Sequence, residues 1–105
     1  MSVIELFTVA PEIQIKPSET PVLTQEGASV NISCTANANP VATIIWKRKE
    51  NNENKDTTGG LLKFSEVSKN DAGIYVCQAT NEIGVSEAKE VQVDVQCKFS
   101  FKDNN

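Results

Sequence analysis

Short stretches in which polar and apolar residues alternate run through this sequence of 105 residues. The segment Ser29–Cys34 reads polar, apolar, polar, apolar, polar, apolar. Because successive side chains of a strand point to opposite faces, this pattern indicates a strand with one buried face. Four further stretches have strand character: Thr43–Lys47, Leu61–Phe64, Gly73–Ala79 and Val91–Val95. No helical 3.6-residue period of useful length appears, so the chain is predicted to be all-β.

The breaks between the predicted strands are rich in residues that form turns. Asn37–Pro40 separates the first strand from the second, and Thr80–Gly84 separates the fourth from the fifth. Asn and Gly tolerate the positive φ angles that tight hairpins require. Pro11, Pro17 and Pro21 are typical of an edge strand, because proline cannot donate to a ladder. Short strands at regular spacing predict an antiparallel sandwich or barrel.

The composition excludes most kinds of chemistry. The chain contains no histidine, which removes the usual general base and most catalytic zinc sites, and its three cysteines form no CxxC motif. No cofactor and no metal are therefore expected. The net charge of −4 disfavours binding to nucleic acid through bulk charge. No stretch approaches the ~20 apolar residues that span a bilayer, so direct membrane insertion is not expected.

The cysteines, the tryptophan and the tyrosine form one pattern. Cys34 lies on the buried face of its predicted strand, Trp46 follows twelve residues later, and the segment Asp71–Cys77 contains Tyr75 two residues before its cysteine. This arrangement resembles the immunoglobulin domain, in which a disulfide between strands B and F packs on a tryptophan of strand C. The tyrosine stands at the tyrosine-corner position of that family.

Longer motifs extend the resemblance. The pattern Leu62-x-Phe64-x-x-Val67-x-x-x-Asp71-x-Gly73-x-Tyr75-x-Cys77 looks like the E–F signature of I-set domains, and Ala79-x-Asn81-x-x-Gly84 looks like their F–G hairpin. The resemblance implies an immunoglobulin-like two-sheet antiparallel β-sandwich. We expect this domain to span residues 11–96. Residues 1–10 are interpreted as a linker or the strand end of a preceding domain rather than a signal peptide, and residues 97–105 as a tail or linker.

The resemblance assigns structural roles to individual residues. It implies a disulfide between Cys34 and Cys77, with a reduced pair in a cytosolic domain as the alternative. It makes Trp46 and Tyr75 the pin of the core, and Asp71, Gly73 and Tyr75 the turn before the second cysteine. The predicted core consists of Val30, Ile32, Cys34, Ile44, Trp46, Leu62, Phe64, Val67, Tyr75, Cys77, Ala79, Val91 and Val93.

The stretch between the second and third predicted strands departs from the I-set pattern. Only 16 positions separate Trp46 from Leu62, and Glu50–Gly60 contains no large apolar residue. Strands C′ and D are therefore expected to be short or missing, which moves the domain toward a C2-like topology. No basic residue matches the usual strand-D partner of Asp71.

Three aliphatic residues are the candidate interface. If Trp46 and Tyr75 face inward, then Ile45, Ile74 and Val76 face outward on neighbouring strands. An apolar patch on the outer face of an antiparallel sheet often marks an interaction site. The alternative is that a loop, or the tail that carries Phe99 and Phe101, covers these residues.

Three smaller features each have a functional and a non-functional interpretation. Asn31-Ile32-Ser33 is an N-glycosylation sequon, although so short a motif also occurs by chance. Cys97 is the odd cysteine: it pairs with another chain or segment, or it is a free thiol in the tail. Lys47–Lys49 is a basic cluster, interpreted as a solvated strand end; the functional alternative is a heparin-like ligand, for which three charges supply little affinity.

The resemblance implies binding rather than catalysis. The chain is expected to be a non-enzymatic protein-binding module of a cell-surface adhesion or receptor protein, one of a tandem array. Its partner would be another protein. Binding would be heterophilic, to a different protein, or homophilic, which includes self-association of this chain. A disulfide favours an extracellular or cell-surface location. The alternative is a cytoplasmic structural module of the kind found in giant muscle and cytoskeletal proteins.

Overall fold

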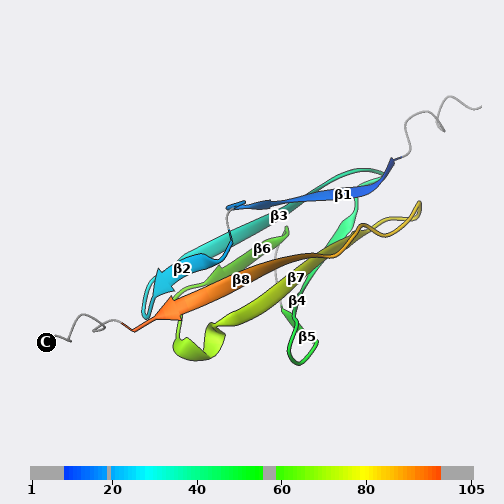
Figure 1. Ribbon diagram of the computed structural model, residues 1–105. Helices are drawn as coiled ribbons and strands as arrows, with labels where there is room; N and C mark the ends of the chain where they lie inside the picture. Colours follow the sequence, from blue (N-terminus) through cyan, green and yellow to red (C-terminus); the bar gives the residue numbers. More distant parts are fainter. Residues whose placement is uncertain (1–8, 19, 56–58, 98–105) are drawn as a thin grey trace, which may run out of the picture.

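The fold is a sandwich of two β-sheets, seen in a computed structural model that describes residues 9–18, 20–55 and 59–97 (Figure 1). The described strands are β1 (Val9–Lys16), β2 (Val22–Gln25), β3 (Val30–Asn39), β4 (Thr43–Arg48), β5 (Glu53–Lys55), β6 (Leu61–Phe64), β7 (Gly73–Thr80) and β8 (Lys89–Gln96), with a 3₁₀ turn η2 (Lys69–Asp71) before β7. One sheet has the order β1-β3-β6 and the other β2-β8-β7-β4-β5. The predicted all-β immunoglobulin-like sandwich is confirmed.

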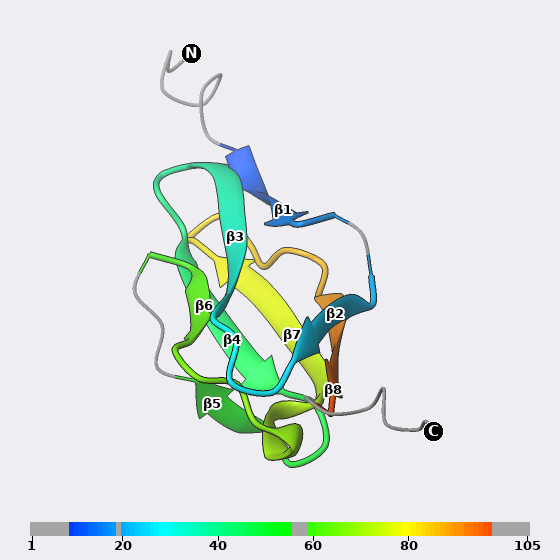
Figure 2. The ribbon, with the colours of Figure 1, turned by 90° about the vertical axis from the view of Figure 1, so that its left-hand side faces the viewer.

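The strand pairs are antiparallel, apart from β2 with β8. The N-terminal segment runs along β3 as β1, crosses between the layers near Pro17 and Pro21, and continues as β2 in the other sheet (Figure 2). Because β2 keeps its direction after the crossing, it meets β8 in parallel. The two prolines fall in this crossing segment, where no ladder hydrogen bond is required of them.

Alternation along the strands builds the core. In β3 and β6 the register pairs Val30 with Phe64 and Ile32 with Leu62, and all four side chains are buried between the sheets. Tyr75 packs edge-on against Phe64 from the opposite sheet, with ring centroids 5.6 Å apart. Every residue of the predicted core is buried except Ile44.

Two residues correct the predicted core. Ile44 is only half-buried, because it lies beside a hollow of about 460 Å³ that is lined by small residues such as Ala36, Ala38 and Gly59. Ile13, on the proline-flanked β1, is buried, because β1 pairs with β3 and places Ile13 opposite Ala36. The edge position of β1 therefore does not prevent one of its side chains from entering the core.

The connection from β4 to β6 is short, as expected. Strand β5 has three residues and pairs with β4, placing Lys55 opposite Trp46. Between β5 and β6 the described residues contain no further strand, and residues 56–58 lie outside the described part. Residues 1–8 and 98–105, which include most of the predicted linker and the predicted tail with Phe99 and Phe101, also lie outside it. The last two residues of the predicted linker, Val9 and Ala10, form the start of β1.

Candidate functional site

A disulfide joins the two sheets at their centre. Cys34 of β3 and Cys77 of β7 are bonded, with Cα atoms 6.7 Å apart, and neither residue is exposed. Trp46 lies directly opposite Cys77 in the β4–β7 register and is also fully buried. Its indole nitrogen donates to the carbonyl oxygen of Gly60 at 2.8 Å. The expected disulfide is therefore present, and the tryptophan is fixed beside it.

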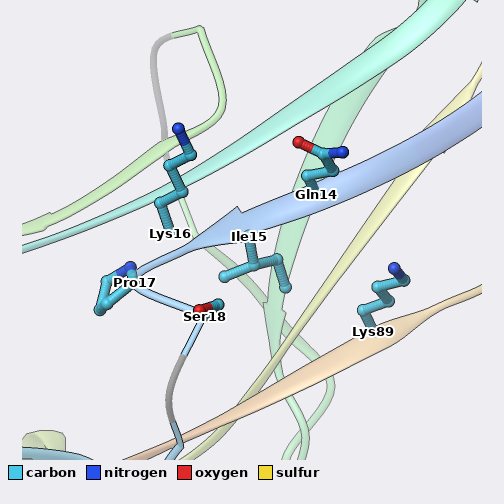
Figure 3. Close-up of a pocket in the computed structure, with 6 residues that line it drawn as sticks. All are labelled: Gln14, Ile15, Lys16, Pro17, Ser18 and Lys89. Atoms are coloured by element: carbon cyan, nitrogen blue, oxygen red, sulfur yellow. The ribbon is translucent and has the colours of Figure 1, made fainter.

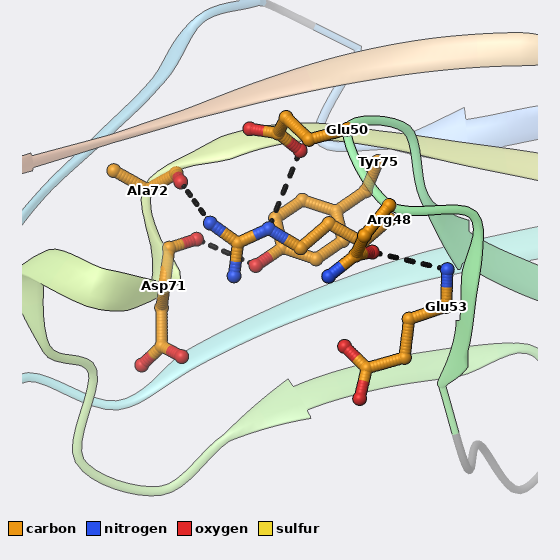
Figure 4. A network of polar contacts seen from close by, with 7 residues as sticks. Arg48, Glu50, Glu53, Asp71, Ala72 and Tyr75 are labelled. Carbon is orange, nitrogen blue, oxygen red and sulfur yellow. Dashed lines mark hydrogen bonds and ion pairs between the residues drawn. The ribbon is translucent and has the colours of Figure 1, made fainter.

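Tyr75 is held at the turn before β7. Its hydroxyl donates to the carbonyl oxygen of Asp71 at 2.5 Å, which is the hydrogen bond of a tyrosine corner (Figure 4). The carboxylate of Asp71 accepts the amide of Ser68 at 2.8 Å and so caps η2. Burial raises the pKa of the Tyr75 phenol above its ordinary value.

Arg48 completes this cluster, although the sequence predicts a solvated basic strand end at this position. Its guanidinium lies 5.7 Å from the ring centroid of Tyr75 and donates to the carbonyl oxygen of Ala72 at 2.7 Å (Figure 4). It also donates to the Glu50 carboxylate at 3.3 Å. A backbone hydrogen bond at Glu50 itself, aided by Arg48, lowers the pKa of that carboxyl group. The strand alternation from Trp46, two residues earlier, is the signal that could have shown Arg48 pointing inward.

The candidate interface lies on the outer face of the five-stranded sheet. Ile45 is 41% exposed, whereas Ile74 and Val76 on the central strand β7 are half-buried. The β4–β7 register sets Ile45 opposite Gln78 and Val76 opposite Lys47. The three aliphatic residues are thus outward-facing neighbours of charged and polar side chains.

An ion pair crosses this outer face. The ammonium of Lys49, the residue after β4, lies 2.7 Å from the carboxylate of Glu90 on β8. Between these strands runs β7: the amide of Lys49 donates to the carbonyl of Ile74, and Glu90 is paired with Val76. The two long side chains therefore meet across β7, which explains why Ile74 and Val76 are only partly exposed. Sequence reasoning missed this pair, because nothing local places positions 49 and 90 together.

A hollow lies at an edge of the sandwich, between β1 and β8 (Figure 3). It measures about 550 Å³, and its lining includes Ile15, Lys16 and Lys89. The ammonium of Lys89 donates to the carbonyl oxygen of Ile13 at 3.0 Å. This contact ties β8 to β1 where the two strands belong to different sheets, so Lys89 stabilises the open edge.

The remaining candidate residues lie away from the outer face of β7. Asn31 is exposed on β3, in the other sheet, opposite Lys63 of β6. Cys97 follows β8, is half-buried and is a free thiol among the described residues. In the same part of the chain no group of three or more acidic or cysteine side chains could hold a metal ion. No described helix is long and apolar enough to cross a bilayer.

The chain belongs to the immunoglobulin domain family, whose family model matches residues 10–81. It is 36% identical over 91 residues to vascular cell adhesion protein 1 of Rattus norvegicus, covering 82% of this chain and 11% of that protein. It is 36% identical over 84 residues to contactin-4 of Homo sapiens, covering 75% of this chain and 8% of that protein. The chain thus spans about a tenth of the length of these relatives.

Solved structures of similar fold agree with this assignment. Extracellular domains 3–5 of Drosophila OTK match with a TM-score of 0.72 and 25% identity, over 85% of this chain and 32% of that chain. A crystal structure of Dpr2 Ig1-Ig2 in complex with DIP-Theta Ig1-Ig3 matches with a TM-score of 0.70 and 29% identity, over 84% and 32% of the two chains.

Proposed function

We propose that this chain is a non-enzymatic, protein-binding immunoglobulin module of a cell-surface adhesion or receptor protein. Relatives at 36% identity include a vascular cell adhesion protein, and one similar structure is a complex between two immunoglobulin proteins. The buried Cys34–Cys77 disulfide favours an oxidising, extracellular compartment. The I-set motifs together with the short β4–β6 connection support a subtype between the I-set and C2 types.

The observation that carries the binding function is the outer face of β4, β7 and β8. Antiparallel sheets usually present polar side chains to water, yet this face carries Ile45, Ile74 and Val76. An aliphatic centre with charged residues at its margin, here Lys49 and Glu90, has the anatomy of a protein interface. The ligand is therefore another protein, either a second copy or a different chain.

The position of the strand ends favours a place in a tandem array. In Figure 1 the chain enters the sandwich at one end through β1 and leaves it at the opposite end through β8. Modules with this geometry can be joined end to end without blocking the sheet faces. The proposed array leaves the outer face of the β2-β8-β7-β4-β5 sheet accessible to a partner.

The other sheet is the proposed site of a glycan. Asn31 is exposed in the sequon Asn31-Ile32-Ser33, and its neighbour across the ladder is Lys63 of β6. A glycan on this residue would shield the β1-β3-β6 face. Binding would then be directed to the five-stranded sheet, on the opposite side of the sandwich.

The test is binding of the tetramerised module to intact cells, before and after surface proteins are removed with trypsin. We expect trypsin-sensitive binding that falls at least ~tenfold when Ile74→Lys places a charge at the centre of the face. Leu61→Lys is the matched control, because Leu61 is 37% exposed on the opposite sheet. Equal loss in both variants, or binding that survives trypsin, would contradict the proposal, provided that thermal unfolding shows both variants folded.

The rival function is that of an intracellular structural module. The redox state of Cys34 and Cys77 in the native source separates the two. Alkylation of the native protein under denaturing conditions, followed by mass spectrometry, should find both cysteines bonded. Two free thiols would favour the intracellular alternative.

A further inference from the structure

The outer face of the five-stranded sheet has an ordered arrangement of charge. Val76 on the central strand β7 pairs with Lys47 on β4 and with Glu90 on β8, so one row across the sheet reads cation, aliphatic, anion. The next row has a cation on the same side: the amide of Lys49 is hydrogen-bonded to Ile74, and Ile74 pairs with Gln92 on β8. Cations lie on one side of β7, and side chains that accept hydrogen bonds lie on the other.

This arrangement is self-complementary under one particular symmetry. A two-fold axis that lies above β7 and parallel to it places β4 of one copy over β8 of the other. Lys47 then faces Glu90 of the second copy, the reciprocal pair forms at the same time, and Val76 and Ile74 each face their own equivalents. A two-fold axis across the strands would instead set Lys47 against Lys47 of the second copy.

We propose that two copies of this module pair face to face through this sheet, about a two-fold axis parallel to β7, with Lys47 of each copy opposite Glu90 of the other. This inference rests on the proposed function and names the partner as a second copy. Opposite charges on the two margins favour this orientation. A two-fold axis across the strands is disfavoured, because it sets like charges against each other. The twist of the sheets confines close contact to the central strands, where Ile74 and Val76 lie.

The ion pair within one copy does not oppose this pairing strongly. Lys49 and Glu90 keep 53% and 47% of their side-chain surface exposed, and exposed pairs contribute little to stability. In the described part of the chain, Lys47 has no ion-pair partner of its own. Glu90 can therefore exchange Lys49 for Lys47 of the second copy, which uncovers Ile74 and Val76 for contact.

The test is sedimentation equilibrium of charge variants on a Cys97→Ser background, which excludes dimers made by that thiol. Lys47→Glu and Glu90→Lys should each raise the dissociation constant of the dimer at least ~tenfold, because each sets like charges against each other. An equimolar mixture of the two variants should restore the dimer. In that mixed dimer the introduced carboxylate of one variant faces the introduced ammonium of the other, and the unchanged Lys47 faces the unchanged Glu90. Lys63→Glu and Glu12→Lys, exposed on the other sheet, are the matched controls and should change nothing.

Four results would overturn the pairing. They are a wild-type chain that stays monomeric, single variants that dimerise like wild type, a mixture of the two variants that fails to restore the dimer, or a heterodimer of Lys47→Glu with wild type that is tighter than the wild-type dimer. The last result would instead assign the two-fold axis that runs across the strands, which sets position 47 of one copy against position 47 of the other. Failure here is distinguishable from failure of the proposed function, because a monomeric chain that still binds cells through Ile74 binds a different protein.

Discussion

The indole of Trp46 and the amide of Cys34 donate to the same oxygen, the carbonyl of Gly60, at 2.8 and 2.9 Å. Trp46 belongs to one sheet and Cys34 to the other, so Gly60 fastens the β5–β6 connection to both sheets beside the disulfide. A fully buried indole N–H without an acceptor would cost about 1–3 kcal/mol. Gly60 therefore holds the polar atom of the largest core residue.

Replacement of Gly60 tests this arrangement. Its φ is +83°, and a Cβ at this position would collide with the carbonyl oxygen of Cys34, which belongs to the backbone and cannot move aside. We expect Gly60→Ala to lower the free energy of unfolding by more than about 3 kcal/mol. Gly59→Ala is the control: φ is +62°, nothing lies near the added atom, and the cost should be about 1 kcal/mol.

Denaturant unfolding monitored by the fluorescence of the single tryptophan measures both variants. Equal destabilisation of the two would show that backbone strain alone matters and that the crowding at Cys34 does not.

At Gly73, unlike Gly60, an added Cβ would meet a side chain and not the backbone. Its φ is +151°, and an added Cβ would meet the carboxylate of Glu50, which is the end of a flexible side chain. Gly73→Ala should cost about 1–3 kcal/mol through backbone strain alone. In the double variant Gly73→Ala with Glu50→Ala, the loss in free energy of unfolding should then equal the sum of the losses in the two single variants. Recovery of most of the lost stability in the double variant would place the cost in the side-chain collision instead.

The raised pKa of Tyr75 predicts how stability depends on alkaline pH. A phenol whose pKa is higher in the folded state than in the unfolded state contributes stability that is complete below the unfolded value of about 10. That contribution is lost as the pH rises through the folded pKa. Because Tyr75 is the only tyrosine, its ionisation can be followed by ultraviolet absorbance without interference.

We expect the absorbance change of the native chain to lie at higher pH than that of the chain unfolded in guanidinium. Tyr75→Phe, which removes the hydrogen bond to Asp71, should be less stable by about 1 kcal/mol at neutral pH and should lose less stability on alkaline titration. Coincident titration curves for the native and unfolded chains would contradict the buried position of the phenol.

The disulfide should contribute strongly to stability. It closes a loop of 43 residues, for which chain entropy gives about 4 kcal/mol. Cys34→Ala with Cys77→Ala should lower the free energy of unfolding by roughly that amount, and the buried volume lost at both sites adds to the effect. Identical unfolding midpoints for wild type and the double variant would show that the two sheets hold together without the bond.

Alternation of polar and apolar residues is a local pattern, and it predicted which side chains of each strand are buried. The disulfide between Cys34 and Cys77 joins positions that are distant in sequence, and it was predicted only because the Cys34–Trp46–Cys77 pattern resembles that of the immunoglobulin family. Prediction failed where the deciding contact is distant in sequence and no family motif marks it. Ile13 is buried because β1 pairs with β3, and Ile44 is half-exposed because small residues of β3 leave a hollow beside it. The Lys49–Glu90 pair could not be predicted, since it depends on β7 lying between β4 and β8.

Photo-crosslinking on intact cells measures most directly whether the outer face of β4, β7 and β8 is the binding surface. A photoreactive amino acid is incorporated in place of Ile45, or in place of Leu61, which has similar exposure on the opposite sheet. We expect irradiation to attach a protein to the module at position 45 and not at position 61. Attachment at position 61 without attachment at position 45 would show that the module binds through the other face.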